Sequence, residues 1–291
     1  MYNKNVRYES DYYLIERNPM TIIVGTKFDE GIVIGSDSQL TFGDSLIKRT
    51  GSEKIFEINL SEKLKFIVAG AGNPFYINMA KDIIINLCVQ RDCNSIEQFI
   101  FICEDAANTM SKRYVIDKSV DLGIMEKSKI SGIGLAEWLG EINRVLDYSL
   151  LIGLCISNED GINHALVSLG SDGSAINHEH YAATGHGWIF AEYIFSRLWS
   201  DELKDLGAID IILYVIEEVK KMDTTCGGNS GISILKGDKI VPKDKEFIRT
   251  LEEQSQVLQK IDGALTIVWK DMLKNPYKPN TQNEEKKDNK Q

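Results

Sequence analysis

Segments with strand character come in runs along this chain, and segments with helical character come in pairs. Strand-like text opens at residue 21, two helical segments cover 74–115, strands return at 149–173, and a second helical pair covers 184–222. A parallel sheet would instead require strands and helices in regular alternation. The order therefore predicts an α+β fold in which two antiparallel sheets pack together and helices cover both outer faces, a four-layer αββα sandwich.

Local signals support this order. Segment 21–39 contains two β-branched apolar runs joined by the polar residues 27–31, which predicts a hairpin. Two further strands are predicted at 52–59 and 63–72, before helical spacing begins. Ser95 is the predicted N-cap of the second helix, because a serine side chain can accept a hydrogen bond from the first free N–H groups.

Composition excludes several classes of partner. The 291 residues carry a formal net charge of -10, which repels nucleic acid and anionic membrane surfaces. No apolar stretch reaches the ~18 residues that a membrane span needs, and the first twenty residues do not resemble a signal peptide. The five cysteines form no CxxC pair and no His–Cys ligand cluster. We therefore expect a soluble cytoplasmic protein without a metal or organic cofactor.

Three charged residues lie within or beside predicted strands and helices. Asp37 lies inside IVIGSDSQ, Lys54 precedes IFEI, and Asp223 ends a helical segment before a glycine turn. Buried charges are costly unless paired, so the three side chains are expected to meet where strand ends converge. A lysine near an acid and a hydroxyl activates a nucleophile. The alternative is that both aspartates are turn or capping residues and Lys54 begins a surface strand.

Several motifs in order resemble one known family. They are TIIVGTKFDEGIVIGSDSQLTFG, KIFEINLSEKLKFIVAGAG, GLCISNEDGINHALVSLGSDG, TGHG before a helix, and DTTCGGNSGISIL. Together they resemble proteasome β subunits and the related bacterial protease subunit HslV. The resemblance covers about 21–235, apart from 116–147, which looks like an insertion. It implies the fold of the N-terminal-nucleophile hydrolases.

The resemblance also implies a role for individual residues. Thr21 resembles the nucleophile, Asp37 and Lys54 resemble the pair that tunes it, Gly70 resembles the donor of an oxyanion-facing N–H, and Asp223 resembles a further acid. A threonine with a free α-amino group carries its own base, because the amine has a reference pKa of about 7.7–8.0. The lysine charge favours the alkoxide, and Asp37 compensates that charge.

The chain departs from the family pattern at two supporting positions. Such subunits commonly have Gly-Ser-Gly where this chain has His186, and a serine before the glycine pair where it has Cys226 followed by Gly227. Cysteine keeps the size of serine but weakens its hydrogen bond, whereas histidine adds bulk and a titratable group. Both changes affect the predicted support of the α-amine, so the pattern also allows a noncatalytic structural subunit.

The N-terminal neighbour of Thr21 is Met20, where such subunits usually present glycine. The hypothesis is that translation starts at Met20, whose removal before the small residue threonine would expose Thr21. The alternatives are autocatalytic cleavage of the Met20–Thr21 bond and an uncleaved, inactive chain. The predicted organisation is an extension or propeptide at 1–20, a hydrolase domain at 21–240 with an insertion near 116–147, a helix at 241–273, and a disordered tail at 274–291.

The functional hypothesis is a threonine peptidase that cleaves amide bonds of a peptide or protein through an acyl-enzyme on Thr21. The resemblance implies a ring of identical subunits, with related subunits or an ATPase as possible partners. Two alternatives remain: an inactive structural subunit of such a ring, and an amidase acting on small amides.

Overall fold

The computed structural model describes residues 21–42, 47–49, 54–116, 146–159 and 161–242, together with Phe247, Leu251 and Glu253. The chain divides into two compact units, Met1–Lys243 and Asp244–Gln291. In the second unit the three described residues are helical. The predicted N-terminal extension, nearly all of the predicted insertion, most of the C-terminal helix and the tail lie outside the described residues.

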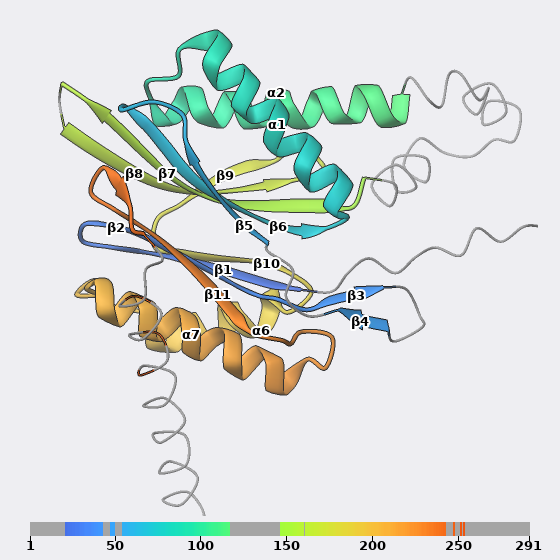
Figure 1. The fold of residues 1–291 in the computed structure, drawn as a ribbon, viewed down its shortest axis with the longest axis vertical. Helices are drawn as coiled ribbons and strands as arrows, with labels where there is room; N and C mark the ends of the chain where they lie inside the picture. Colours follow the sequence, from blue (N-terminus) through green and yellow to red (C-terminus); the bar gives the residue numbers. More distant parts are fainter. Residues whose placement is uncertain are drawn as a thin grey trace, which may run out of the picture. The chain divides into compact units, whose positions relative to one another are not determined.

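Two five-stranded antiparallel sheets form the centre of the first unit (Figure 1). The first sheet contains β1 (Ile22–Phe28), β2 (Gly31–Asp37), β10 (Tyr181–Gly185), β11 (Ser230–Lys236) and β12 (Lys239–Ile240), in the order β10-β1-β2-β11-β12. The second contains β5 (Ile55–Asn59), β6 (Leu64–Gly72), β7 (Tyr148–Asn158), β8 (Gly161–Gly170) and β9 (Ala175–His178), paired in chain order. A separate hairpin joins β3 (Leu40–Phe42) to β4 (Ile47–Arg49).

Helices cover the outer face of each sheet, as Figure 1 shows. Over the second sheet lie α1 (Pro74–Arg91) and α2 (Ile96–Ser111), the latter continued by the π-helical turn η1 (Lys112–Ile116). Over the first sheet lie α6 (Trp188–Leu198) and α7 (Asp205–Met222). The predicted four-layer αββα sandwich is confirmed. No helix in the described part of the chain combines the length and apolarity needed to cross a membrane.

Local sequence signals explain where several elements begin. The predicted hairpin forms with Asp29 and Glu30 between β1 and β2. Ser95 is the N-cap of α2, accepting a hydrogen bond from the Gln98 N–H at 3.2 Å. Asn73 caps α1 in the same way, just before a proline at the first helical position. Side-chain capping therefore fixes the start of both helices over the second sheet.

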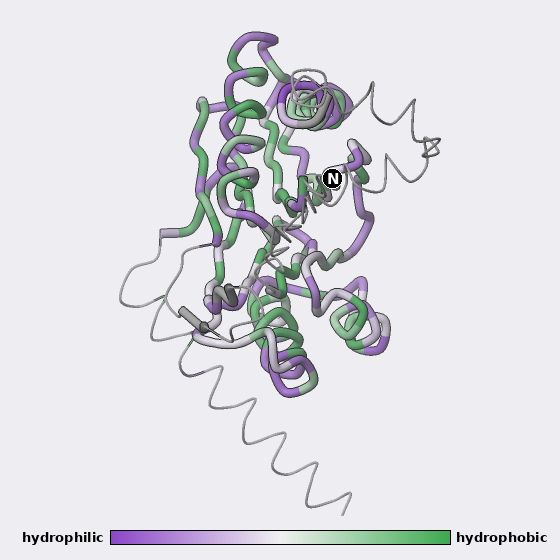
Figure 2. The backbone as a smooth tube through the Cα atoms, turned by 90° about the vertical axis from the view of Figure 1, so that its right-hand side faces the viewer, coloured by the Kyte–Doolittle hydropathy of each residue, from purple (hydrophilic) through white to green (hydrophobic). Residues whose placement is uncertain are grey.

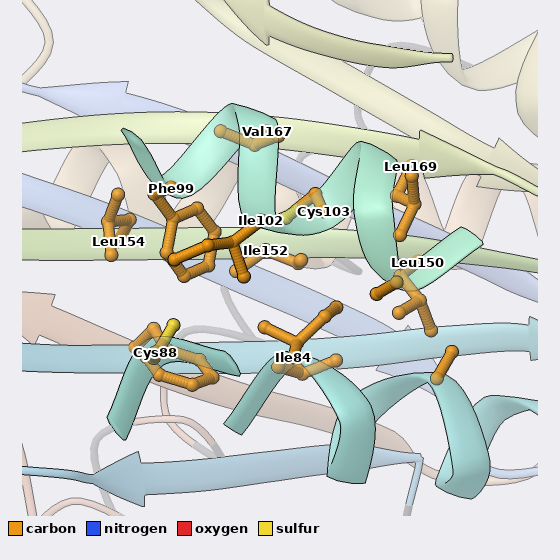
Figure 3. Close-up of a cluster of buried hydrophobic side chains, with 14 of the residues drawn as sticks. Ile84, Cys88, Phe99, Ile102, Cys103, Leu150, Ile152, Leu154, Val167 and Leu169 are labelled. Atoms are coloured by element: carbon orange, nitrogen blue, oxygen red, sulfur yellow. The ribbon is translucent and has the colours of Figure 1, made fainter. Parts of the chain in front are cut away.

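A dry apolar cluster holds the first helical pair to its sheet. Phe99 and Phe66 pack edge to face with ring centroids 5.5 Å apart. Figure 3 shows side chains of the two helices facing those of the sheet, including Ile84, Cys88, Phe99, Ile102, Cys103, Leu150, Ile152, Leu154, Val167 and Leu169. A second cluster fills the space between the two sheets. Hydrophobic residues accordingly concentrate where layers meet (Figure 2).

Shortening Ile84 to valine should destabilise this layer modestly. The Ile84 side chain is fully buried, so deleting one methyl group should lower the free energy of unfolding by about 0.5–1.5 kcal/mol. Val89→Ala on the same helix is the control, because Val89 is 65% exposed and its loss should cost less than about 0.5 kcal/mol. Urea unfolding of both variants checks this, and equal effects would contradict the assigned burial.

Candidate active site

Strand pairing brings the start of β1 beside the ends of two neighbouring strands. Ile22 pairs with Gly185 at the end of β10, and Ile23 pairs with Ser36 near the end of β2. Thr21 therefore lies next to Asp37, which ends β2. Both residues are buried, Thr21 at 2% and Asp37 at 0% exposure.

Lys54 joins these two residues from the other sheet, immediately before β5. Its ammonium group donates to Asp37 Oδ1 at 2.7 Å and to the Gln39 carbonyl oxygen at 2.6 Å. It also contacts the Thr21 hydroxyl, which itself donates to Asp37 Oδ1. The structure thus brings three predicted site residues, Thr21, Asp37 and Lys54, into direct contact.

Backbone donors complete the surroundings of Asp37. The Ile22 N–H donates to Oδ1 at 3.2 Å, and the Gly227 N–H donates to Oδ2 at 2.9 Å. With Lys54 and Thr21, these groups engage both carboxylate oxygens. The buried negative charge is therefore compensated by a cation and satisfied by hydrogen bonds, as a buried ion pair requires.

Burial controls the protonation of Lys54. Desolvation lowers the pKa of its ammonium group, and the attraction of Asp37 raises it without cancelling the effect, so the pKa lies below the ordinary lysine value. In its protonated form the ammonium group places a positive charge against the Thr21 hydroxyl. The arrangement can therefore stabilise an alkoxide on Thr21.

A second polar cluster centres on Asp223, the residue that ends α7. His186 Nδ1 lies 2.8 Å from Asp223 Oδ2, and Thr225 donates to Oδ1 through its backbone N–H at 2.9 Å and through its hydroxyl. Burial alone would raise the pKa of Asp223, but the hydrogen bonds from His186 and Thr225 outweigh it and hold that pKa below its ordinary value. Asp223 is therefore an ionised acceptor at neutral pH.

The turn after α7 connects the two clusters. The Cys226 N–H donates to the Asp223 carbonyl at 3.1 Å, and the next residue, Gly227, binds Asp37 as described above. Gly227 also accepts a hydrogen bond from the Gln39 N–H at 3.0 Å, and the Gln39 side chain donates to the Thr225 carbonyl at 2.9 Å. The predicted residues Asp223, Cys226 and Gly227 thus belong to one network with Thr21.

Gly70 lies beside this network in a different way from the prediction. Its N–H donates to the Lys54 carbonyl oxygen at 3.3 Å, which extends the pairing of β5 with β6. A Cβ at this position would lie 2.3 Å from Ile77 of α1, so the glycine allows close packing of helix and strand. The oxyanion role of Gly70 stays a prediction.

Two residues of the site were missed by the sequence reasoning. Gly185 has a φ of +91°, and a Cβ there would lie 2.3 Å from the Thr21 carbonyl oxygen, so only glycine fits without strain. Gln39 contributes its backbone carbonyl to Lys54, which no side-chain pattern reveals. The Gly-His-Gly motif was the available signal for Gly185, whereas Gln39 had none.

Cys226 is held in its protonated form. Burial, followed by the negative charges of Asp37 and Asp223, raises the pKa of its thiol to about 12. At pH 8 only about one thiol in ten thousand would be ionised, and the thiolate is the reactive form.

Among the described residues, no cluster of three or more His, Cys, Asp or Glu side chains is arranged to hold a metal ion.

Alkylation should therefore spare Cys226 in the folded protein. The residue is 4% exposed, so iodoacetamide at pH 8 should leave it unmodified until the protein is unfolded. Mass spectrometry of the peptide that contains Cys226, before and after denaturation, measures this. Rapid modification in the folded state would show that the Cys226 thiolate is accessible, and Cys226 would then be a candidate nucleophile.

Comparisons with known proteins agree with this geometry. Residues 20–74, which hold Thr21, Asp37 and Lys54, match the family model for proteasome subunits. A search of curated proteins by sequence found no match. The specific likeness to HslV stays a prediction.

Solved structures of Anbu proteins share the fold at low sequence identity. The Anbu (Gly-1) mutant from Hyphomicrobium sp. strain MC1 has a TM-score of 0.57 at 13% identity, covering 84% of this chain and 96% of that one. Anbu, an ancestral beta-subunit, from Yersinia bercovieri has a TM-score of 0.56 at 14% identity, covering 84% and 97%. The helical assembly of the Anbu complex from Pseudomonas aeruginosa gives 0.59 at 16% identity, covering 90% and 100%. The chain therefore shares the fold of these Anbu structures, and its residues 20–74 match the family model for proteasome subunits.

Proposed function

We propose that this chain is a threonine-type N-terminal-nucleophile hydrolase, a cytoplasmic peptidase of a proteasome-like assembly that acts through Thr21. The observation that carries the proposal is the buried contact of the Thr21 hydroxyl with both Asp37 and Lys54. A hydroxyl held between an ammonium group and a carboxylate is an activated nucleophile, and a packing role would not require two buried charges beside it.

The reaction proceeds through two acyl-transfer steps. Thr21 Oγ attacks the carbonyl carbon of a peptide bond while its proton passes to the free α-amine of Thr21. The C–N bond then breaks, and the departing amine takes up that proton, which leaves an ester on Thr21. Water hydrolyses the ester, releases the acid product and restores the hydroxyl. Lys54 stabilises negative charge on Oγ, and Asp37 fixes the position of Lys54.

The free amine requires a chain that begins at Thr21. Intact mass and N-terminal sequencing of the protein purified from its own host separate the possibilities. A mature chain starting at Thr21 is the expected result. A chain that retains residues before Thr21 would remove the internal base and favour a structural subunit, a role also in keeping with His186 and Cys226 at positions where serine is common.

Self-assembly is part of the proposal. The Anbu complex from Pseudomonas aeruginosa forms a helical assembly, and this chain shares its fold. We expect identical subunits to associate, with a peptide or protein as substrate and with related subunits or an ATPase as further partners. Light scattering after size-exclusion chromatography measures the assembly, and fluorogenic peptides compared with small amides distinguish a peptidase from an amidase.

A further inference from the structure

His186 and Asp223 form an oriented pair beside the proposed nucleophile. Asp223 is firmly placed, with its side chain 8% exposed and Thr225 bound to the oxygen that His186 does not use. The His186 side chain is 58% exposed, so its ring is held at one nitrogen and open to solvent elsewhere. An imidazole held in this way differs from a buried histidine that only fills space.

The ionised state of Asp223 determines which nitrogen of the His186 ring carries the hydrogen. An ionised carboxylate only accepts hydrogen bonds, so His186 Nδ1 must donate its N–H across the 2.8 Å contact. In the neutral ring the lone pair is then on Nε2. Nε2 has no hydrogen-bond partner within the part of the chain that the structure describes, so it is free to accept a proton.

The neighbours of His186 in the chain place the pair at the site. Gly185 packs directly against the backbone of Thr21, with a hypothetical Cβ only 2.3 Å from the Thr21 carbonyl oxygen. Gly187 packs near Ile22 and the Cys226 sulfur, where a Cβ would lie 3.5 Å from each. His186 therefore stands between two glycines that both pack against Thr21 or its neighbours, and its own side chain is exposed to solvent.

We propose that His186, oriented by Asp223, is the general base that activates the water in the second half of the reaction. The inference rests on the proposed function. As the water oxygen bonds to the acyl carbon, one water proton moves to His186 Nε2. The ester bond to Thr21 Oγ then breaks, and the imidazolium returns that proton to Oγ. The acid product leaves, and both His186 and Thr21 regain their starting forms.

The distinguishing experiment separates acylation from hydrolysis of the acyl-enzyme. With an activated ester substrate, His186→Gln should keep the acylation burst within about twofold of the wild type and slow acyl-enzyme hydrolysis by about 100-fold. Intact mass should show the acylated chain accumulating in this variant. In His186→Ala, added imidazole should restore part of the lost rate, because this substitution vacates a position that is open to solvent. Asp223→Asn should slow the same step.

His180→Gln is the matched control. The His180 side chain is 41% exposed and packs against Trp199, with ring centroids 3.9 Å apart, rather than against Asp37, Lys54 or Asp223. The rate constants of His180→Gln for acylation and for hydrolysis of the acyl-enzyme should both equal those of the wild type. Circular dichroism of each variant verifies folding.

The outcomes distinguish the two proposals. Wild-type protein that forms no ester on Thr21 would overturn the proposed function and this inference together. A wild type that acylates normally, with unchanged hydrolysis of the acyl-enzyme in His186→Gln, overturns the role of His186 alone. An equal loss of both rates without rescue by imidazole would show a structural role and overturn it as well.

Discussion

Replacing Thr21 by alanine is expected to reduce peptide hydrolysis by roughly 10⁴-fold or more, because the substitution removes the proposed nucleophile. The nearby Cys226 cannot take its place, since burial and the negative charges of Asp37 and Asp223 raise the pKa of its thiol to about 12 and keep it protonated. The Lys54–Asp37 ion pair at 2.7 Å survives the change, so the free energy of unfolding should fall by only about 1–2 kcal/mol. Initial rates with a fluorogenic peptide and urea unfolding measure both quantities.

Thr26→Ala is the matched control for Thr21→Ala. Thr26 lies in β1, the strand that follows Thr21, at 0% exposure, and its hydroxyl donates to the His180 carbonyl at 3.3 Å and not to Asp37 or Lys54. This variant should lose stability to a similar degree and keep its activity. Thr21→Ser should retain measurable hydrolysis, since it keeps a hydroxyl. Activity in Thr21→Ala above a tenth of the wild-type rate would contradict the proposal.

Replacing Asp37 by alanine should destabilise the protein by about 3–5 kcal/mol and also remove activity. The substitution leaves the buried Lys54 ammonium without its charge partner and takes acceptors from the N–H groups of Ile22 and Gly227. The double variant Asp37→Ala/Lys54→Met should recover much of the lost stability, because it removes the unpaired charge. Urea unfolding at neutral pH of the two single variants and the double variant measures this double-mutant cycle. If the two single losses of stability simply add up in the double variant, Asp37 and Lys54 are not a coupled pair.

The stability of the wild type should also respond to the state of Lys54. Its folded-state pKa lies below the ordinary lysine value, so the unfolded chain binds this proton more strongly. Stability contributed by Lys54 therefore increases as pH rises from the folded-state pKa towards the ordinary value. Asp37→Ala removes the group that raises the pKa of Lys54, and a deprotonated Lys54 no longer places an unpaired charge in the core. The loss of stability caused by Asp37→Ala should therefore become smaller at alkaline pH.

Sequence reasoning succeeded where the chain itself carries a strong local signal. Alternating β-branched residues predicted the hairpin of β1 and β2, and the serine before α2 predicted its cap. The predicted meeting of Asp37 and Lys54 also occurs, because charges in apolar segments must find partners. The strands β9 and β10 were not predicted. Their short sequences, AINH and YAATG, lack a run of β-branched residues. They form strands because they pair with neighbouring strands.

Contacts made by backbone atoms could not be predicted from residue types. The carbonyl of Gln39 and the N–H of Gly227 bind Lys54 and Asp37, and any residue has these groups. The Gly70 N–H likewise donates to the Lys54 carbonyl because the strand pairing continues to that point, a contact that no residue type reveals. The sequence indicates which side chains must be compensated, and tertiary structure decides which backbone groups do so.

The most direct test of Thr21 as nucleophile is to map the adduct formed by a β-lactone, an electrophile that acylates an activated hydroxyl. The protein is incubated with the lactone, digested, and analysed by tandem mass spectrometry. We expect one ester, on Thr21, that is missing from Thr21→Ala. A wild-type protein that stays unmodified, or that carries its adduct at another residue while Thr21 remains free, would show that Thr21 is not the nucleophile.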